Sequence, residues 1–360
     1  MFPDVPGSTQ PRPPATAISR RDFVRATAAA GAAAGLAPAL AGCDRSPRLN
    51  LYIWSDYLAP DTVPGFERET GIHVTVDTFE SNEELAAKLL AGAQGYDVVV
   101  PSAYVLPGLV SQGLLLPIPS GSLARLDNIA PVFRGGAANP APGFAVPYHW
   151  GISGIAWRKD KIPVLPATWG VFLDPAHAGP MTMMDDGREV LGAMLRLRGH
   201  SINSTEPAEL EQARVDALAA RPNLRAYVSA PVKGQLVSGD VWIAQLWNGD
   251  AAQARQEQAD IAWLAPAEGA AIWTDFLAIP ANAPNVREAL AFIDHILRPD
   301  VDAAIATATG YGSCNAAATA LLADPVPDPT PEEMERLEYM HDLGQATELF
   351  DRIWTEIKAG

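Results

Sequence analysis

The sequence between residues 49 and 101 alternates strand-like and helix-like segments, and this alternation limits the possible folds more than any other feature. The strand-like segments are LNLYIW (49–54), HVTVDTF (73–79) and YDVVVP (96–101). Between the first two, DTVPGFERETG (61–71) has a helical pattern that ends at Gly71. Parallel strands need such helical crossovers, and the apolar run 96–101 suits a strand buried on both faces. The sequence therefore predicts an α/β fold.

A second helix is predicted directly after the strand 73–79. Residues 81–84, Ser-Asn-Glu-Glu, match a capping box, in which a serine and a glutamate satisfy free backbone N–H groups at a helix start. Leu85, Leu89 and Leu90 then form one apolar stripe, and Gly92 and Gly95 end the helix before the next strand. These signals complete a β-α-β-α-β unit.

The rest of the chain repeats the pattern less regularly. Further strands are predicted at 151–157, 179–184, 241–247 and 271–280, and helices at 208–219 and 286–297. The proline-rich segment 325–332 is predicted to be a loop before one final helix over 334–360. Because 360 residues exceed what one ordinary core accommodates, two α/β lobes are the simplest architecture.

The first 43 residues have the composition of an export signal. Arg20 and Arg21 precede a weakly hydrophobic stretch rich in Ala, Gly and Leu, which ends in Leu40-Ala41-Gly42-Cys43. Paired arginines before such a stretch indicate twin-arginine export, and small residues before a cysteine resemble a bacterial lipoprotein cleavage site. The alternative, an ordinary Ala-rich helix, would need a polar face that is absent here. We expect Cys43 to become the lipidated N-terminus, and the following Asp44 resembles an inner-membrane retention signal.

The net charge limits the kinds of partner that the protein can bind, and the cysteine content limits its disulfides. The net charge is −16, and it becomes more negative without residues 1–43, which hold four arginines and two aspartates. Such a body repels nucleic acid and attracts cations, although acidity often serves solubility alone. After cleavage Cys314 is the only thiol, so no disulfide within the chain is expected.

Local motifs for catalysis, cofactors and metals are missing from the sequence. There is no G-x-S-x-G elbow, no phosphate-binding loop and no GxGxxG after the first strand. The six histidines are far apart and show no metal-binding spacing. We therefore predict neither a cofactor nor a metal, while a catalytic site assembled from distant residues stays open.

Aromatic rings and carboxylates recur together where predicted strands end. These clusters include Trp54 to Tyr57, Asp185 to Glu189, Trp247 to Asp250, Trp273 to Asp275, and the residues around Tyr104 and Tyr311. Each cluster alone could be packing or a helix cap. Together, converging carboxylates would need a neutralising cation, and ring faces attract ammonium groups and pack against methylene chains. This combination favours a linear aliphatic polyamine over an amino acid or a sugar.

Several of these segments, in their order along the chain, also resemble one known family. The segments are YIWSDYLAPDTVPGFERETGI, TFESNEELAAKL, YDVVVPSAYV, VPYHWGISGIAW, DDGREV, WNGDAAQA, IWTDFLAIPANAPN, LRPDVD and TGYGSCNAAA. They resemble the spermidine/putrescine-binding proteins of bacterial ABC importers over about residues 48–358. The resemblance implies a type II periplasmic binding protein fold, in which two lobes joined by crossover strands close over a ligand. The implied lobes are 48–150 with 271–318, and 151–270 with 319–360.

The resemblance also implies which residues bind ligand. The aromatic box of the family falls on Trp54, Tyr57, Tyr104, Trp247, Trp273 and Tyr311. Its carboxylates fall on Asp56, Asp186, Glu189, Asp250 and Asp275, and its hydrogen-bonding hydroxyls on Ser55 and Ser102. Asp275 is the strongest candidate, because the family holds a central amine from that position.

The resemblance does not indicate whether the protein prefers spermidine or putrescine, because its motifs match both patterns. Asp186 with Glu189, three residues apart and able to share a helix face, is similar to the spermidine-preferring pattern. The WSDY segment and Asp250 are instead similar to the putrescine-preferring pattern. Met340 stands where the family has an amide side chain, and Cys314 matches no family role.

Three functions follow as hypotheses. The first is a monomeric, lipid-anchored periplasmic receptor that delivers an amine to an ABC permease in the inner membrane and touches the membrane only through its lipid. The second is a sensor with the same fold, which neighbouring permease genes would argue against. The third is an exported enzyme on this scaffold, which turnover of a bound amine would reveal.

Overall fold

The computed structural model describes residues 47–119, 121–229, 231–326 and 329–360. Residues Ser46–Gly360 form one compact unit. The predicted export signal and its lipidation site Cys43 lie outside the described residues. Among the described residues, none of the helices is long and apolar enough to span a membrane.

The strands form one mixed sheet with the order β2-β1-β3-β9-β4-β7-β5-β6, in which β10 and β8 also pair with β4, and β11 with β9. The strands are β1 (Arg48–Trp54), β2 (His73–Phe79), β3 (Val98–Val99), β4 (Ala145–Arg158), β5 (Met181–Met183), β6 (Leu224–Tyr227), β7 (Ile243–Trp247), β8 (Ile261–Leu264), β9 (Ala270–Ala278), β10 (Gly312–Ser313) and β11 (Leu337–Tyr339). Pairs β1 with β2 and β5 with β7 are parallel, whereas β4 runs antiparallel to β9 and β7.

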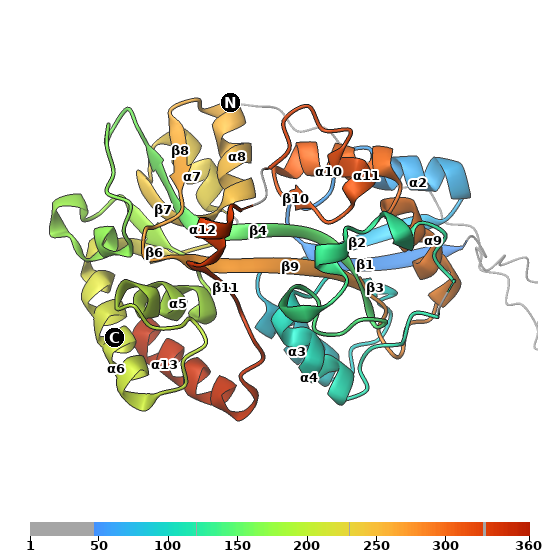
Figure 1. Cartoon of the computed structure of the whole chain (residues 1–360), viewed down its shortest axis with the longest axis horizontal. Helices are drawn as coiled ribbons and strands as arrows, with labels where there is room; N and C mark the ends of the chain where they lie inside the picture. Colours follow the sequence, from blue (N-terminus) through green and yellow to red (C-terminus); the bar gives the residue numbers. More distant parts are fainter. Residues whose placement is uncertain (1–46, 120, 230, 327–328) are drawn as a thin grey trace, which may run out of the picture. The chain divides into compact units, whose positions relative to one another are not determined.

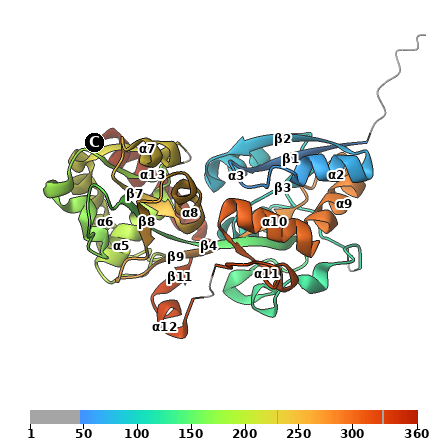
Figure 2. The ribbon, with the colours of Figure 1, turned by 90° about the horizontal axis from the view of Figure 1, so that it is seen from above.

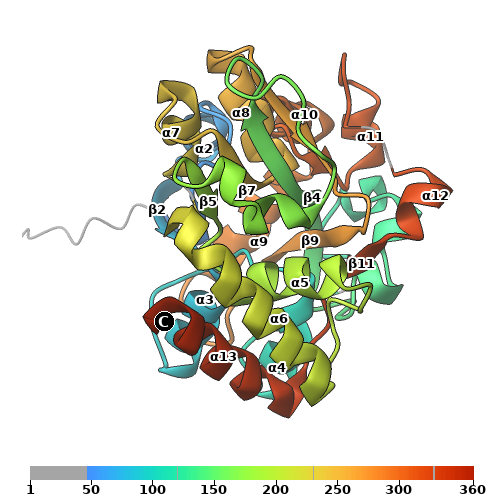
Figure 3. The ribbon, with the colours of Figure 1, turned by 90° about the vertical axis from the view of Figure 1, so that its left-hand side faces the viewer.

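Helices cover both ends of this sheet. They are α2 (Thr62–Thr70), α3 (Asn82–Leu90), α4 (Leu106–Ser111), α5 (Gly187–Leu197), α6 (Pro207–Ala220), α7 (Val232–Ser238), α8 (Asn248–Glu257), α9 (Val286–Ile296), α10 (Pro299–Thr309), α11 (Ala316–Thr319), α12 (Pro331–Met334) and α13 (Thr347–Ala359). Figure 3 shows α5, α6 and α13 packed together at the end that holds β5 to β7.

Two long strands, β4 and β9, connect two groups of elements (Figures 1 and 2). Strands β1, β2 and β3 lie at one end with α2, α3 and α9, and β5, β6 and β7 lie at the other end with α5 to α8. The first part of β4 pairs with β9 as far as Ile152, and the part from Ser153 onward pairs with β7 and β8. Strand β4 therefore passes from one lobe into the other, as a crossover strand does.

The predicted lobe limits stay a proposal. The limit at 150/151 falls inside β4, and the limit at 270/271 falls at the first residue of β9. We propose the same division, 48–150 with 271–318 and 151–270 with 319–360, because both limits coincide with the strands that cross.

The β-α-β unit predicted at the start of the described chain is confirmed. Strands β1 and β2 pair in parallel from Arg48 opposite His73 to Trp54 opposite Phe79. Helix α2 ends at Gly71, whose φ of 69° is in the left-handed region that glycine adopts without strain. Apolar residues of β1 lie in the core, where Phe66 of α2 contacts Phe292 of α9 edge to face.

The capping box before α3 forms only in part. The Ser81 side chain accepts a hydrogen bond from the backbone N–H of Glu84, as predicted. The Glu84 carboxylate accepts instead from the backbone N–H of Glu80, one residue before the cap. The helix still starts where the sequence signal predicts, because the serine bond alone satisfies a free N–H.

The single final helix predicted over 334–360 is wrong. The structure has strand β11 at Leu337–Tyr339, and a helix only from Thr347 onward. Strand β11 pairs in parallel with β9, from Leu337 opposite Ala270 to Tyr339 opposite Ile272. Pairing with a distant strand thus overrides the local helical pattern of this segment.

Candidate functional site

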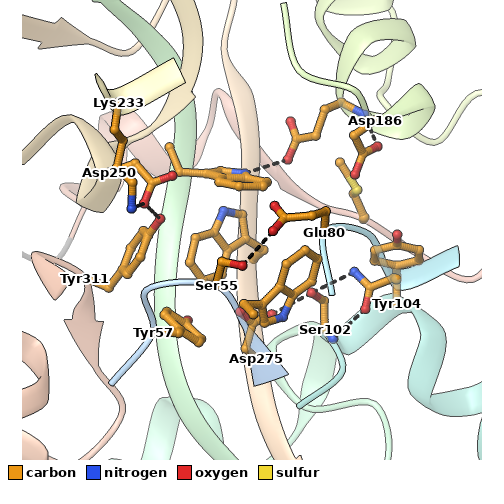
Figure 4. Close-up of a pocket in the computed structure, with 16 residues that line it drawn as sticks. Ser55, Tyr57, Glu80, Ser102, Tyr104, Asp186, Lys233, Asp250, Asp275 and Tyr311 are labelled. Carbon is orange, nitrogen blue, oxygen red and sulfur yellow. Dashed lines mark hydrogen bonds and ion pairs between the residues drawn. The ribbon is translucent and has the colours of Figure 1, made fainter. Parts of the chain in front are cut away.

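A cavity lies between the two lobes, and side chains from both line it (Figure 4). It holds about 660 Å³ of space not filled by atoms, part of it open to solvent. The structure brings together all the predicted site residues except Asp56: Trp54, Ser55, Tyr57, Ser102, Tyr104, Asp186, Glu189, Trp247, Asp250, Trp273, Asp275 and Tyr311.

Strand ends position many of these side chains. Trp54 is the last residue of β1, Trp247 is the last residue of β7, and Ser102 follows β3. Asp186 follows β5 and starts α5. Parallel strands β1 and β3 of one lobe and β5 and β7 of the other each bring residues at or after their carboxyl ends to the cavity, so residues far apart in sequence meet there.

Asp275 lies on the crossover strand β9 at the bottom of the cavity and is only 4% exposed. The Ser102 hydroxyl donates to Asp275 Oδ1 at 2.5 Å, and the Asn82 amide in turn donates to the Ser102 hydroxyl at 2.9 Å. Burial raises the pKa of Asp275 to about 7, although the nearby hydroxyl groups of Ser102 and Tyr57 oppose the rise. The group is therefore more readily protonated than an exposed aspartate, and a cation beside it would favour the charged form.

Glu189 and Asp186 form a second acidic group in the cavity. The Glu189 carboxylate accepts hydrogen bonds from the Ser153 hydroxyl at 2.7 Å and from the Trp247 indole N–H at 3.1 Å. Burial, with the nearby Asp186 charge, raises the pKa of Glu189 to about 7. Burial also raises the pKa of Asp186, against the hydrogen bonds it accepts from backbone N–H groups.

The sequence predicted that Asp186 and Glu189 could share one helix face; both side chains do line the cavity, but Asp186 precedes the helix that contains Glu189. It is the N-cap of α5, and its Oδ1 accepts hydrogen bonds from the backbone N–H groups of Arg188 and Glu189. The aspartate precedes the first helical residue because Asp is among the residues most favoured at the N-cap position. Oδ1 of Asp186 therefore caps helix α5.

Asp250 and Lys233 lie at the other side of the cavity (Figure 4). The Tyr311 hydroxyl donates to Asp250 Oδ1 at 3.0 Å, and Lys233 Nζ lies 3.6 Å from the same oxygen. Burial raises the pKa of Asp250, and the Lys233 charge opposes this rise. Asp56 is absent from the cavity lining, and its Oδ2 accepts a 2.8 Å hydrogen bond from Lys233 Nζ.

Aromatic rings form a continuous row along the cavity. Ring centroids are 6.1 Å apart for Trp54 and Trp247, 6.4 Å for Trp247 and Trp273, and 5.1 Å for Trp273 and Tyr311. The Tyr57 ring meets Tyr311 edge-on at 5.3 Å. Trp54 belongs to one lobe and Trp247 to the other, so this row crosses between the lobes.

Tyr104 is less available than the other rings. Its hydroxyl donates to Glu83 Oε1 at 3.0 Å, and the guanidinium carbon of Arg188 lies 5.1 Å from its ring centroid. A cation already occupies one ring face, so Tyr104 offers the cavity mainly its remaining surface.

Sequence reasoning missed Glu80, Asn82 and Lys233 among the lining residues. Glu80 and Asn82 directly follow β2, so the same strand-end rule could have found them. Lys233 lies in the short helix α7, and no local pattern marks it. Met340, noted as a departure from the family pattern, lines the cavity as the residue after β11.

No metal site is evident in the described part of the chain, where no three His, Cys, Asp or Glu side chains are grouped to hold an ion. The acids of the cavity are instead bonded to hydroxyl, indole and backbone donors. The arrangement can receive a small organic cation through its acids and the apolar part of that molecule through its rings.

Comparison with known proteins gives consistent matches over most of the chain. The family model described as bacterial extracellular solute-binding protein matches residues 62–332. The spermidine/putrescine-binding periplasmic protein of Escherichia coli is 35% identical, covering 92% of this chain and 97% of that protein. The putrescine-binding periplasmic protein PotF of the same organism is also 35% identical, covering 87% of this chain and 91% of that protein.

A solved structure gives the same result for the fold. The spermidine/putrescine ABC transporter substrate-binding protein PotD of Streptococcus pneumoniae is 30% identical to this chain, with a TM-score of 0.73. The match covers 87% of this chain and 99% of that protein. The predicted two-lobed α/β fold, that of a type II periplasmic binding protein, is confirmed.

Proposed function

The chain belongs to the bacterial extracellular solute-binding proteins, and from this premise we propose that it binds a linear amine of the putrescine and spermidine class. We propose further that it delivers this amine to the permease of an ABC importer. Its relatives are substrate-binding proteins rather than enzymes, and the proposal includes no catalytic step.

One observation carries the proposal: acidic side chains are buried in the cavity with too few cations to balance them. Asp275, Glu189 and Asp186 are each at most 7% exposed. Among the described residues, no Lys, Arg or His side chain forms an ion pair with any of the three. An ammonium group entering the cavity would supply the missing charge and recover the cost of their burial.

The rings support the same class of ligand. Trp54, Trp247 and Trp273 offer flat faces and edges between the acids. Indole faces attract ammonium groups, and they also pack against the methylene chain that separates two amines. A sugar would leave the acids without a cation, and an amino acid would bring a further carboxylate among them.

The proposal is tested by isothermal titration of residues 44–360, with Cys43 omitted. The ligands are putrescine, cadaverine, spermidine and agmatine, and glutamate and maltose serve as controls. We expect micromolar or tighter binding of at least one amine, and no binding of either control. Silence toward every amine would mean that the acids and rings serve another kind of ligand, and would overturn the proposal.

We propose that twin-arginine export precedes lipidation at Cys43, which anchors the protein to the outer face of the inner membrane. Cys43→Ser is expected to move the protein from the membrane fraction to the soluble periplasmic fraction, because the lipid is its proposed membrane contact. Cell fractionation with immunoblotting measures this. Cys314→Ser, which removes the other, buried thiol, should leave the protein with the membrane. Membrane retention of Cys43→Ser would contradict the anchor.

A further inference from the structure

Lys233 brings an ammonium group of the protein itself into the cavity. Its side chain is only 13% exposed, and it extends from α7 toward acids of both lobes. Its Nζ lies 2.8 Å from Asp56 Oδ2, 3.1 Å from Gln253 Oε1 and 3.6 Å from Asp250 Oδ1. Figure 4 shows Lys233 beside Asp250, across the cavity from Asp186 and Tyr104.

This ammonium is chemically the same group as the end of a linear amine. An ammonium has three donors and no acceptor, and the three groups around Lys233 Nζ are all acceptors. A primary amine ending at this place would seek the same contacts. Lys233 thus makes the contacts that a ligand's terminal ammonium would otherwise make.

On the opposite side of the cavity, no lysine is paired with the Asp275 and Glu189 carboxylates in the described part of the chain. The Asp275 carboxylate accepts from Ser102, and the Glu189 carboxylate from Ser153 and Trp247, all of which are uncharged donors. The nearby Arg188 directs its guanidinium to the backbone of His341 and to Asn203. The cavity is therefore asymmetric: Lys233 is paired with the acids on one side, and on the other side none of the described cationic side chains forms an ion pair with Asp275, Glu189 or Asp186, although the Arg188 charge acts on the last two.

We infer that Lys233 determines specificity by occupying the ammonium position at Asp250 and Asp56, so that the protein binds an amine chiefly through one cationic end. The inference rests on the proposed function, since it concerns which amine the same cavity prefers. A second ligand ammonium must either approach Lys233, where like charges repel, or displace it from Asp250 and Asp56. Both routes reduce what a second amine contributes to affinity. Within the putrescine and spermidine class, the ammonium on the side of Asp275 and Glu189 then contributes most of the affinity.

The decisive quantity is the affinity ratio of putrescine to n-butylamine, which share a four-carbon chain and differ by one ammonium. Both are titrated against the purified protein and against Lys233→Met, with weak binding measured by competition. Methionine keeps the length of the side chain and removes its charge. We expect the ratio to shift toward putrescine by about tenfold or more in Lys233→Met, the effect of one charge-assisted contact.

Lys159→Met is the matched control, because it removes the same charge from an exposed position that does not line the cavity. Its ratio should equal that of the unaltered protein. If both amines weaken equally in Lys233→Met, the lysine only holds the lobes together, and the inference is overturned. An unchanged ratio overturns it too, while the proposed function stands. If neither amine binds either protein, this inference is overturned, and the titration with all four amines decides whether the proposed function fails as well.

Discussion

Asp275→Asn is expected to weaken amine binding by at least tenfold, the largest loss from any single cavity substitution. Asp275 is almost fully buried on β9, and an uncharged hydroxyl is its partner in the described structure. A charge-assisted hydrogen bond contributes about 1.5–3 kcal/mol, and each 1.4 kcal/mol corresponds to about tenfold in affinity. Asparagine has the same shape, can still accept from Ser102, and lacks the charge. Calorimetric titration of the tightest-binding amine measures the change.

Asp61→Asn provides the control for this substitution. Asp61 is an exposed aspartate that pairs with Arg68 and does not line the cavity. Its removal should leave the dissociation constant unchanged. Thermal unfolding of both variants separates lost binding from lost folding, and we expect Asp275→Asn to remain folded because it removes a buried charge. An unaltered dissociation constant for Asp275→Asn would remove Asp275 from the binding site.

Amine affinity is expected to fall steeply as the pH is lowered from 8 to 6. Burial raises the pKa of Asp275 and of Glu189 to about 7 in the ligand-free protein. A bound ammonium favours the charged carboxylates, so their pKa values drop in the complex, and binding releases protons. Below pH 7 the cation must first displace those protons, which costs about tenfold in affinity per group by pH 6, or about a hundredfold for two independent groups.

Titrations at pH 6, 7 and 8 measure this slope, and titrations in two buffers of different ionisation enthalpy count the released protons. At pH 7 each carboxylate that is partly protonated before binding should release a fraction of a proton. Glu189→Gln should reduce both the slope and the proton count, because one titrating group is gone. A flat affinity between pH 6 and 8 without proton release would show that these carboxylates do not face the ligand's charge.

Local signals in the sequence predicted the first lobe well. The parallel pairing of β1 with β2 and the ends of α2 were predictable because alternating apolar residues and Gly71 act within a few residues. The extent of β4 was not predictable, since its first half is fixed by pairing with β9, more than a hundred residues later. The prediction of a helix where strand β11 lies was wrong for the same reason, because the partner strand β9 lies far from β11 in sequence.

In the candidate site, too, local sequence signals predicted some residues, whereas contacts between distant residues were not predicted. Residues such as Trp54, Trp247 and Asp186 were found because they lie at or after strand ends, a position that the sequence marks, whereas Trp273 and Asp275 lie inside β9. The contact between Asp56 and Lys233 joins residues from different lobes and follows no strand-end pattern. Asp56 was predicted to face a ligand ammonium, and the structure pairs it with a lysine instead. Partner choice among distant charges depends on tertiary geometry.

A crystal structure of the protein with its tightest-binding amine tests the central claim most directly. We expect one ammonium within hydrogen-bond distance of Asp275 or Glu189, and methylene groups against Trp54, Trp247 or Trp273. Lys233 should remain beside Asp250, with the other end of the ligand next to it. An amine bound outside this cavity, or one inside it whose ammonium avoids both acids, would contradict the account.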